Sequence, residues 1–348
     1  TTFAGSGASL TALNATNLGS GTVPDARFPA TLPATSAANL TAIPAANITG
    51  TLPAISGANL TNLPVVNPNM IINGAMLISQ RQGTASFALT DSTFGIDRFK
   101  YVGQTSRLTS QQVTDSPAGF AYSFKLTSVG ANTPSASHGN GIWMQLEGND
   151  VGHLNYGTSD AQTTTLSFWV KSSLTGTFGG AFANSALNRS YPYTYVISSA
   201  DTWEKKSITV AGDTTGTWVT TGNSIGLRMY INTGTGSNFN GSAAGSWTGA
   251  DRRDVSGTVQ LEATSGATLQ ITGVKLELGS TATDFPHRGY AEELALCMRY
   301  YYALAGGTTA IGQIGYGGYT LTNYLNINGG NFPVPMRANP SFLITNGT

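Results

Sequence analysis

Short segments in which hydrophobic and polar residues alternate recur between residues 67 and 288. In residues 121–129, Tyr122, Phe124 and Leu126 fall on one face of an extended chain and mostly polar residues fall on the other. A period of two is typical of β-strands with one buried face. The same pattern predicts strands at residues 163–171, 191–197, 207–210, 224–232, 257–262 and 268–277. Because turn residues separate these segments, we expect a mainly β fold, an antiparallel jelly-roll-like β-sandwich over residues 67–288.

The first 66 residues carry a repeat instead of an alternating pattern. Residues 31–44 recur as residues 51–64, with ten of fourteen positions identical. Prolines in each copy disfavour a long helix or a central strand. Such a segment cannot bury enough apolar surface alone, so it is either a disordered linker or a shaft in which identical chains intertwine. We favour an intertwined trimer, whose core would contain Leu32, Leu40, Ile43, Ile48, Leu52, Ile55, Leu60 and Leu63.

A third pattern covers residues 289–348. Residues 291–304 predict a helix, whose apolar stripe contains Leu294, Cys297, Met298, Tyr301 and Tyr302. Strand-like pieces follow at residues 308–314, 319–327 and 341–345. Because Asn346-Gly347 is a hairpin signal at the very end of the chain, we expect this β extension to continue beyond Thr348.

Composition excludes several classes of function. The 348 residues carry 17 basic and 17 acidic side chains, and charged residues make up only 10%. A neutral chain without a cluster of Lys or Arg is unlike a nucleic-acid-binding protein, and no apolar run approaches the ~20 residues of a membrane helix. The single cysteine, Cys297, forms no intrachain disulfide and looks like a small buried hydrophobic residue. No metal-ligand spacing is present, so neither a metal nor a cofactor is expected.

Several motifs, in a fixed order, resemble one known family. They are Asn69–Met76, Gln80-Arg81, Asp97–Phe99, Thr165–Lys171, Asp201–Glu204, Ile271–Ser280, Ala282–Arg288, Glu292–Cys297 and Arg299–Tyr301. The set resembles bacteriophage tail-fibre and receptor-binding proteins with a carbohydrate-binding-module-like β-sandwich. Phe99 stands where the family usually has Trp, and Met298 where it usually has Gln.

The resemblance implies a homotrimeric fibre in the virion that attaches to the host. Its expected partners are other tail or baseplate proteins and a glycan of the host cell surface. Two alternatives stay open: a capsid or neck fibre whose sandwich is only a spacer, and a glycan depolymerase.

No catalytic residue is expected. A glycosidase needs two carboxylates ~5 to 9.5 Å apart, one of them with a raised pKa. The pairs Glu147 with Asp150 and Asp251 with Asp254 have suitable spacing in the sequence, but solvated loop carboxylates explain them better.

For glycan binding, the most suggestive segment is the Gly- and Asn-rich loop at residues 232–253. Aromatic rings can stack on the C–H face of a sugar while amides and charged groups bind its hydroxyls. The candidates in this loop are Asn238, Phe239, Asn240, Trp247, Asp251 and Arg252, with Tyr316 and Tyr319 as a second patch. An alternative role for Trp247, which we favour, is to cover a sheet edge. We also expect burial for Tyr191, Tyr193 and Tyr195.

Overall fold

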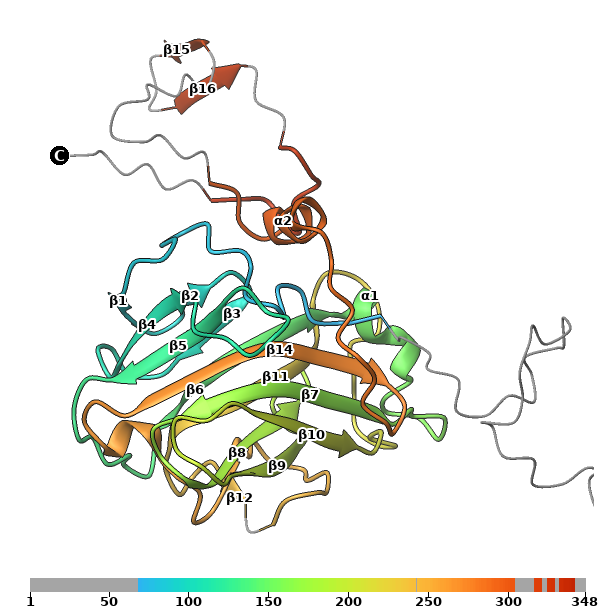
Figure 1. The fold of residues 1–348 in the computed structure, drawn as a ribbon. Coiled ribbons are helices and arrows are strands. Elements are labelled where there is room, and N and C mark those ends of the chain that lie inside the picture. The colour runs from blue at the N-terminus through green and yellow to red at the C-terminus, as the bar shows by residue number, and fades with distance from the viewer. Residues whose placement is uncertain (1–67, 242, 304–315, 321–323, 329–331, 342–348) are drawn as a thin grey trace, which may run out of the picture. The chain divides into compact units, whose positions relative to one another are not determined.

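Two antiparallel six-stranded sheets pack face to face (Figure 1). The computed structural model describes residues 68–303 except Ser242, strands 316–320 and 324–328 as backbone, and residues 332–341. Sheet A contains, in spatial order, β1 (Phe87–Ala88), β4 (Leu108–Val113), β5 (Ser123–Ser128), β14 (Thr268–Leu278), β7 (Thr164–Ser172) and β10 (Glu204–Val210). Sheet B contains β2 (Phe94–Ile96), β3 (Phe99–Val102), β6 (Gly139–Glu147), β11 (Ile225–Thr235), β8 (Gly176–Ala183) and β9 (Ser190–Ile197). The expected mainly β sandwich is confirmed, whereas the predicted domain boundaries stay predictions.

The core lies between the sheets and follows the alternation of the sequence. Phe124 and Leu126 of β5 are buried, and the predicted burial of Tyr191, Tyr193 and Tyr195 on β9 is confirmed. The buried cluster joins side chains of both sheets. Because the inner faces of the two sheets are buried against each other, a ligand-binding surface on either sheet has to lie on its outer face.

One predicted strand is absent. Residues 257–262 contain no β-strand, and Leu261–Ala263 form a 3-10 helix. The Thr258 hydroxyl and the Gln260 amide both donate to the Asp254 carboxylate. Side-chain bonds of this local kind compete with a strand ladder, and here they fold the segment back on itself. Asp254 lies in the short β13 (Asp254–Val255), which pairs in parallel with β12 (Asn240–Gly241).

The predicted helix forms but is shorter than expected. It is α2 (Tyr290–Met298), which ends well before residue 304. Tyr300 lies 3.4 Å beneath the Arg98 guanidinium and Tyr301 lies 3.6 Å beneath that of Arg81, and we attribute the early end of the helix to these contacts. The burial expected for Cys297 is confirmed, at 1% exposed.

In the C-terminal part of the chain, the strand predicted at residues 319–327 was too long. In place of a single strand at residues 319–327, β15 (Tyr316–Thr320) pairs antiparallel with β16 (Tyr324–Asn328). The predicted piece at 308–314 lies outside the described residues, as do the repeat, the proposed shaft core and all of the predicted piece at 341–345 except Ser341. In the part of the chain that is described, no helix has the length and apolar character needed to span a membrane.

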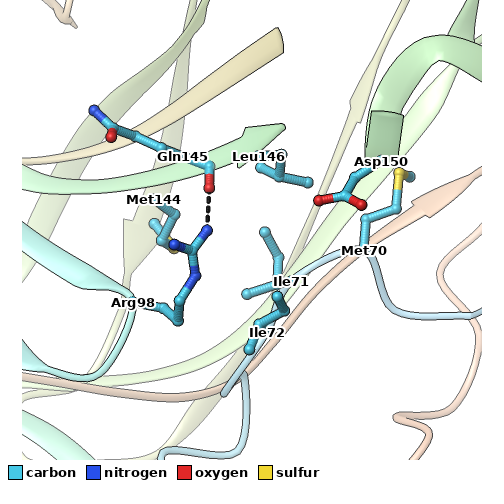
Figure 2. Close-up of a pocket in the computed structure, with 8 residues that line it drawn as sticks. All are labelled: Met70, Ile71, Ile72, Arg98, Met144, Gln145, Leu146 and Asp150. Carbon is cyan, nitrogen blue, oxygen red and sulfur yellow. Dashed lines mark hydrogen bonds between the residues drawn. The ribbon is translucent and has the colours of Figure 1, made fainter. Parts of the chain in front are cut away.

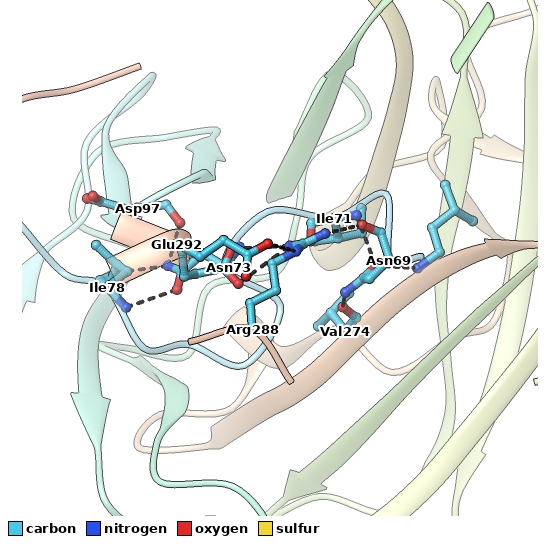
Figure 3. Close-up of polar contacts among 10 residues, drawn as sticks. Asn69, Ile71, Asn73, Ile78, Asp97, Val274, Arg288 and Glu292 are labelled. Atoms are coloured by element: carbon cyan, nitrogen blue, oxygen red, sulfur yellow. Dashed lines mark hydrogen bonds and ion pairs between the residues drawn. The ribbon is translucent and has the colours of Figure 1, made fainter. Parts of the chain in front are cut away.

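The residues that carry the family resemblance meet at a structural junction (Figure 3). Asn69 donates to the Val274 carbonyl of β14, and the Asn73 side chain donates to the carbonyls of Ile78 and Asp97. Arg288 donates to the Ile71 carbonyl and pairs with Glu293 of α2. The bonds from Asn69 to Val274 and from Arg288 to Ile71 join residues 205 and 217 positions apart in the sequence, so this part of the motif set holds the fold together.

Candidate carbohydrate-binding site

Sequence analysis placed the candidate site in the loop after β11, and most of that loop lies against the chain itself. Phe239 is partly buried, with the Arg253 guanidinium 4.2 Å from its ring centre. Asn238 is exposed, and its carbonyl accepts a hydrogen bond from Arg252. Asn240 belongs to β12. The structure thus brings Asn238, Phe239 and Arg252 near one another, but it commits much of their bonding capacity internally.

Trp247 lies in an aromatic cluster at a sheet edge. Its ring is 5.3 to 5.7 Å from those of Trp218, Tyr191 and Tyr156. Its Nε1 donates to the Ala211 carbonyl at 2.7 Å. This is the covering role that we favoured for Trp247, and its role in glycan binding stays an untested prediction.

The remaining predicted residues are placed as follows. Asp251 forms an ion pair with Arg253 at 2.8 Å, so its carboxylate is already occupied. Tyr316 and Tyr319 belong to β15, whose side chains lie outside the description.

Residues 236–241 and 243–258, which we call the covering loop, cover part of the outer face of sheet B, over β6, β11 and β8. Beneath it, Trp143 of β6 faces Tyr230 of β11 with ring centres 5.9 Å apart, and both are under 5% exposed. Arg253 of the covering loop lies 5.1 Å from the Trp143 ring centre. Aromatic rings suited to stacking on a sugar are present on this face, but the chain's own arginine occupies them.

Asp254 of the covering loop lies over β8 and β11 on the outer face of sheet B. It is fully buried, accepts a hydrogen bond from Asn232 of β11 at 2.7 Å, and lies so close to Gly179 of β8 that a Cβ there would be 1.9 Å from its Oδ1. Burial raises the pKa of Asp254 to about 6, although hydrogen bonds from Thr258 and Gln260 act in the opposite direction. This carboxylate is a structural group of the covering loop.

The outer face of sheet A is different, because part of it carries side chains that are partly exposed, such as Lys125 and Trp169, or exposed, such as Lys205, beside the buried Gln270 and Thr272. Four residues lie directly across from one another on β4, β5, β14 and β7, in the order Gln111, Lys125, Gln270 and Lys171. A neighbouring row contains Thr272, Trp169 and Lys205. With Trp203 and Asp115 from adjoining loops, these residues form what we call the lysine–tryptophan face.

Asp115 connects this face. Its carboxylate pairs with Lys171 and accepts hydrogen bonds from Gln270 at 3.1 Å and from the Trp203 indole at 3.3 Å. Burial opposes ionisation, but these hydrogen bonds outweigh it and hold the pKa of Asp115 below its usual value. The Lys171 ammonium also lies 5.3 Å from the Trp203 ring centre. The network fixes an indole, an ammonium group and an amide in one arrangement, while the Asp115 side chain stays half exposed.

A β-bulge in β14 marks one border of the lysine–tryptophan face. The register shifts between Thr272 and Lys275, around Gly273, whose φ is +61°. A Cβ on Gly273 would lie 2.7 Å from Phe120 and 3.1 Å from Trp169, so the missing side chain allows both rings to pack on the backbone. Beyond the bulge, Lys275 and Glu277 form a fully buried ion pair. There, Thr283 and the Asp284 carbonyl cover the sheet.

One carboxylate pair considered for catalysis has divergent environments. Burial opposes ionisation of Glu147, but hydrogen bonds led by that from Arg299 lower its pKa. Burial, followed by the charge of Glu147, raises the pKa of Asp150. Asp150 borders a cavity of about 10 Å³ between Met70 and Leu146 (Figure 2), which is about the smallest space that holds a water molecule. A sugar ring does not fit there. Within the described residues, no group of three or more His, Cys, Asp or Glu could hold a metal ion.

Comparisons with known proteins give no family. No family model and no curated protein sequence matches the chain. Among solved structures, it is similar to the enzymatically active domain of tailspike protein 4 of bacteriophage CBA120, at 12% identity and a TM-score of 0.31. The match covers 61% of this chain and 21% of that one, so the chain spans about a fifth of the tailspike domain's length.

Two carbohydrate-binding modules are also similar in structure. For a family 4 module the identity is 12% and the TM-score 0.28, with 60% of this chain and 99% of the module covered. For the family 11 module of Clostridium thermocellum, solved with a mixed-linked tetrasaccharide, the values are 9%, 0.29, 58% and 100%. Scores at this level carry no argument about function, which has to come from the residues themselves.

Sequence reasoning missed the lysine–tryptophan face. The available signal was the alternation in residues 165–171, which places Trp169 and Lys171 on the face opposite Phe168 and Val170. What the sequence did not reveal is that residues 125, 171 and 270 share one row, because that depends on which distant strands become neighbours.

Proposed function

We propose that this protein binds a glycan on the lysine–tryptophan face of sheet A. The observation that carries the proposal is the pair of partly exposed indoles, Trp169 and Trp203, beside amide and ammonium donors on a sheet face that the covering loop leaves free. A pyranose ring has apolar C–H faces and a polar rim. Stacked on an indole, it would present its hydroxyls to side chains such as Lys171 and the exposed Lys205.

We further propose that the chain is a homotrimeric phage tail fibre that uses this face for host attachment. The in-register repeat of residues 31–64 and the order of the family-like motifs support this. Weak sites in several copies per virion would gain avidity through effective concentration. Mass measurement of the native assembly tests the trimer, with three times the 36.1 kDa chain as the expected value. A single chain at high concentration would contradict the fibre.

The glycan-binding proposal is tested with Trp203→Ala on the full chain. Glycan arrays and calorimetry should show binding by the wild type and a loss of about tenfold or more in the variant. Burying about 60 Å² of C–H surface against the indole, at ~25 cal/mol per Å², contributes about 1.5 kcal/mol, which corresponds to about tenfold in affinity. Tyr290→Ala is the matched control, since Tyr290 is 62% exposed on α2, away from the face. Absence of binding to any glycan would favour the spacer alternative. Product release from a host polysaccharide would instead favour the depolymerase.

A further inference from the structure

We infer that the glycan bound by the lysine–tryptophan face is acidic, carrying carboxylate, sulfate or phosphate groups. The inference rests on the proposed function and adds the chemical class of its ligand. It comes from how the chain distributes its few lysines. Of six in the sequence, four lie on the outer face of sheet A: Lys125, Lys171, Lys205 and Lys275.

Two of these four lysines are neutralised within the protein. Lys275 pairs with Glu277 in a buried contact at 3.0 Å, and Lys171 pairs with Asp115. Lys125 and Lys205 have no ion pair with any described residue. Asp201 and Asp284 are the other exposed acids on segments bordering this face, and neither pairs with them. The open part of the face therefore carries two uncompensated ammonium groups in a chain whose net charge is zero.

The register places these charges around the stacking surface. Lys125 on β5 is one strand from Gln270 on β14, which in turn faces Lys171 on β7. Lys205 on β10 faces Trp169 directly. With strands ~4.8 Å apart, the ammonium-bearing positions lie on the order of 10 to 15 Å apart across the sheet. A short oligosaccharide lying across the strands would reach both free lysines while one of its rings stacks on an indole.

Charge complementarity favours an anionic ligand over a neutral one. A neutral sugar needs amides and hydroxyls, but Gln270 and Thr272 are buried and the partly exposed amide among these residues is that of Gln111. Such a sugar gains little from free ammonium groups. An acidic sugar would form charge-assisted hydrogen bonds, which are about twice as strong as neutral ones. Asp115 fits this arrangement, because its charge is already taken up by Lys171 and does not face the ligand alone.

The test compares acidic oligosaccharides with their neutral counterparts on the full chain. The probes are polygalacturonate, alginate and hyaluronan oligosaccharides, each beside its carboxyl-reduced form, and heparin oligosaccharides beside their desulfated form. We expect at least one acidic probe to bind, with its neutral form at least tenfold weaker. Affinity for the acidic probe should fall as the salt concentration rises from 50 to 500 mM, because salt screens the attraction between exposed charges. Comparing the loss of affinity on carboxyl reduction with the loss on desulfation shows whether the protein recognises carboxylate or sulfate groups.

The lysine variants make the inference specific to this face. Lys125→Gln combined with Lys205→Gln should lower affinity for the acidic probe about tenfold or more, and Lys100→Gln should leave it unchanged. Lys100 is the matched control because it is a partly exposed lysine on β3 of sheet B. Equal loss in both variants would overturn the inference. So would salt-independent binding of neutral glycans that still requires Trp203, an outcome that leaves glycan binding itself intact. Binding of no probe by the wild type would overturn both.

Discussion

The outer faces of the two sheets carry similar side chains in opposite situations. On sheet B, Trp143 stacks against Arg253 of the covering loop and is 4% exposed. On sheet A, Trp203 lies near the Lys171 ammonium and stays partly exposed. The same pairing of an indole with a cation therefore stabilises the fold on one face and is free to meet a ligand on the other. What separates the two faces is the covering loop, and composition does not distinguish them.

The largest expected effect compares the two tryptophans by truncation. Trp143→Ala removes a buried ring from between Tyr230 and two arginines, and we expect it to lower the free energy of unfolding by about 3–5 kcal/mol. Trp203→Ala should cost about 1 kcal/mol, since its ring is partly exposed and contacts Lys171 and the half-exposed Asp115, while glycan binding is lost. Urea unfolding measures both. Similar destabilisation by the two changes would show that Trp203 is a structural residue like Trp143.

The second prediction concerns the buried acid of the covered face. Burial raises the pKa of Asp254 to about 6 from its ordinary 3.8, so the folded state holds its proton more tightly than the unfolded state does. The contribution of Asp254 to the free energy of unfolding should be largest below about pH 4. It should be lost as the pH rises to 6, by up to about 3 kcal/mol. Asp254→Asn should flatten this dependence in thermal unfolding followed from pH 4 to 8. An unchanged pH profile in the variant would assign the titration to another group.

The third prediction tests the border of the lysine–tryptophan face. Gly273→Ala places a methyl group at a positive φ and against Phe120, and we expect a loss of about 2 kcal/mol together with weaker glycan binding. Gly222→Ala is the matched control, because Gly222 also has a positive φ, +73°, but has nothing within 4 Å of an added Cβ. It should cost about 1 kcal/mol and leave binding unchanged. Equal effects of the two changes would mean that packing on Gly273 does not support the face.

The alternation of the sequence predicted the fold well because it reports local burial. Tyr191, Tyr193 and Tyr195 are buried as their spacing indicated. The pattern failed at residues 257–262, where apolar and polar residues alternate, but bonds to Asp254 bend the chain back. The alternation of apolar and polar residues does not show that the side chains of Thr258 and Gln260 will bond to a carboxylate four to six residues earlier in the chain.

The candidate site was harder to predict because exposure depends on tertiary packing. A loop with Phe239, Trp247 and Arg252 suggested a ligand site by its composition. In the structure Phe239 contacts Arg253, Trp247 contacts Trp218, and Arg252 donates to the Asn238 carbonyl. The row containing Lys125, Gln270 and Lys171 joins strands in the order β5, β14 and β7. That order follows from the pairing of sheet A, which nothing in the individual segments specifies.

The smallest expected effect concerns Asp115 on the lysine–tryptophan face. Its effect on the pH dependence of stability is opposite in sign to that of Asp254. Hydrogen bonds from Lys171, Gln270 and Trp203 lower the pKa of Asp115 despite partial burial, so its charged form stabilises the fold. That contribution is present above its ordinary pKa of 3.8 and is lost as the pH falls through the lowered folded value.

Because the Asp115 side chain is 50% exposed, the pair with Lys171 is screened and should contribute less than about 1 kcal/mol. Asp115→Asn should therefore leave the urea midpoint at pH 7 nearly unchanged in 0.5 M salt and reduce the loss of stability between pH 4 and 2. If the variant instead lost several kcal/mol at pH 7, Asp115 would be a structural acid, and the two outer faces would not differ in the way their burial indicates.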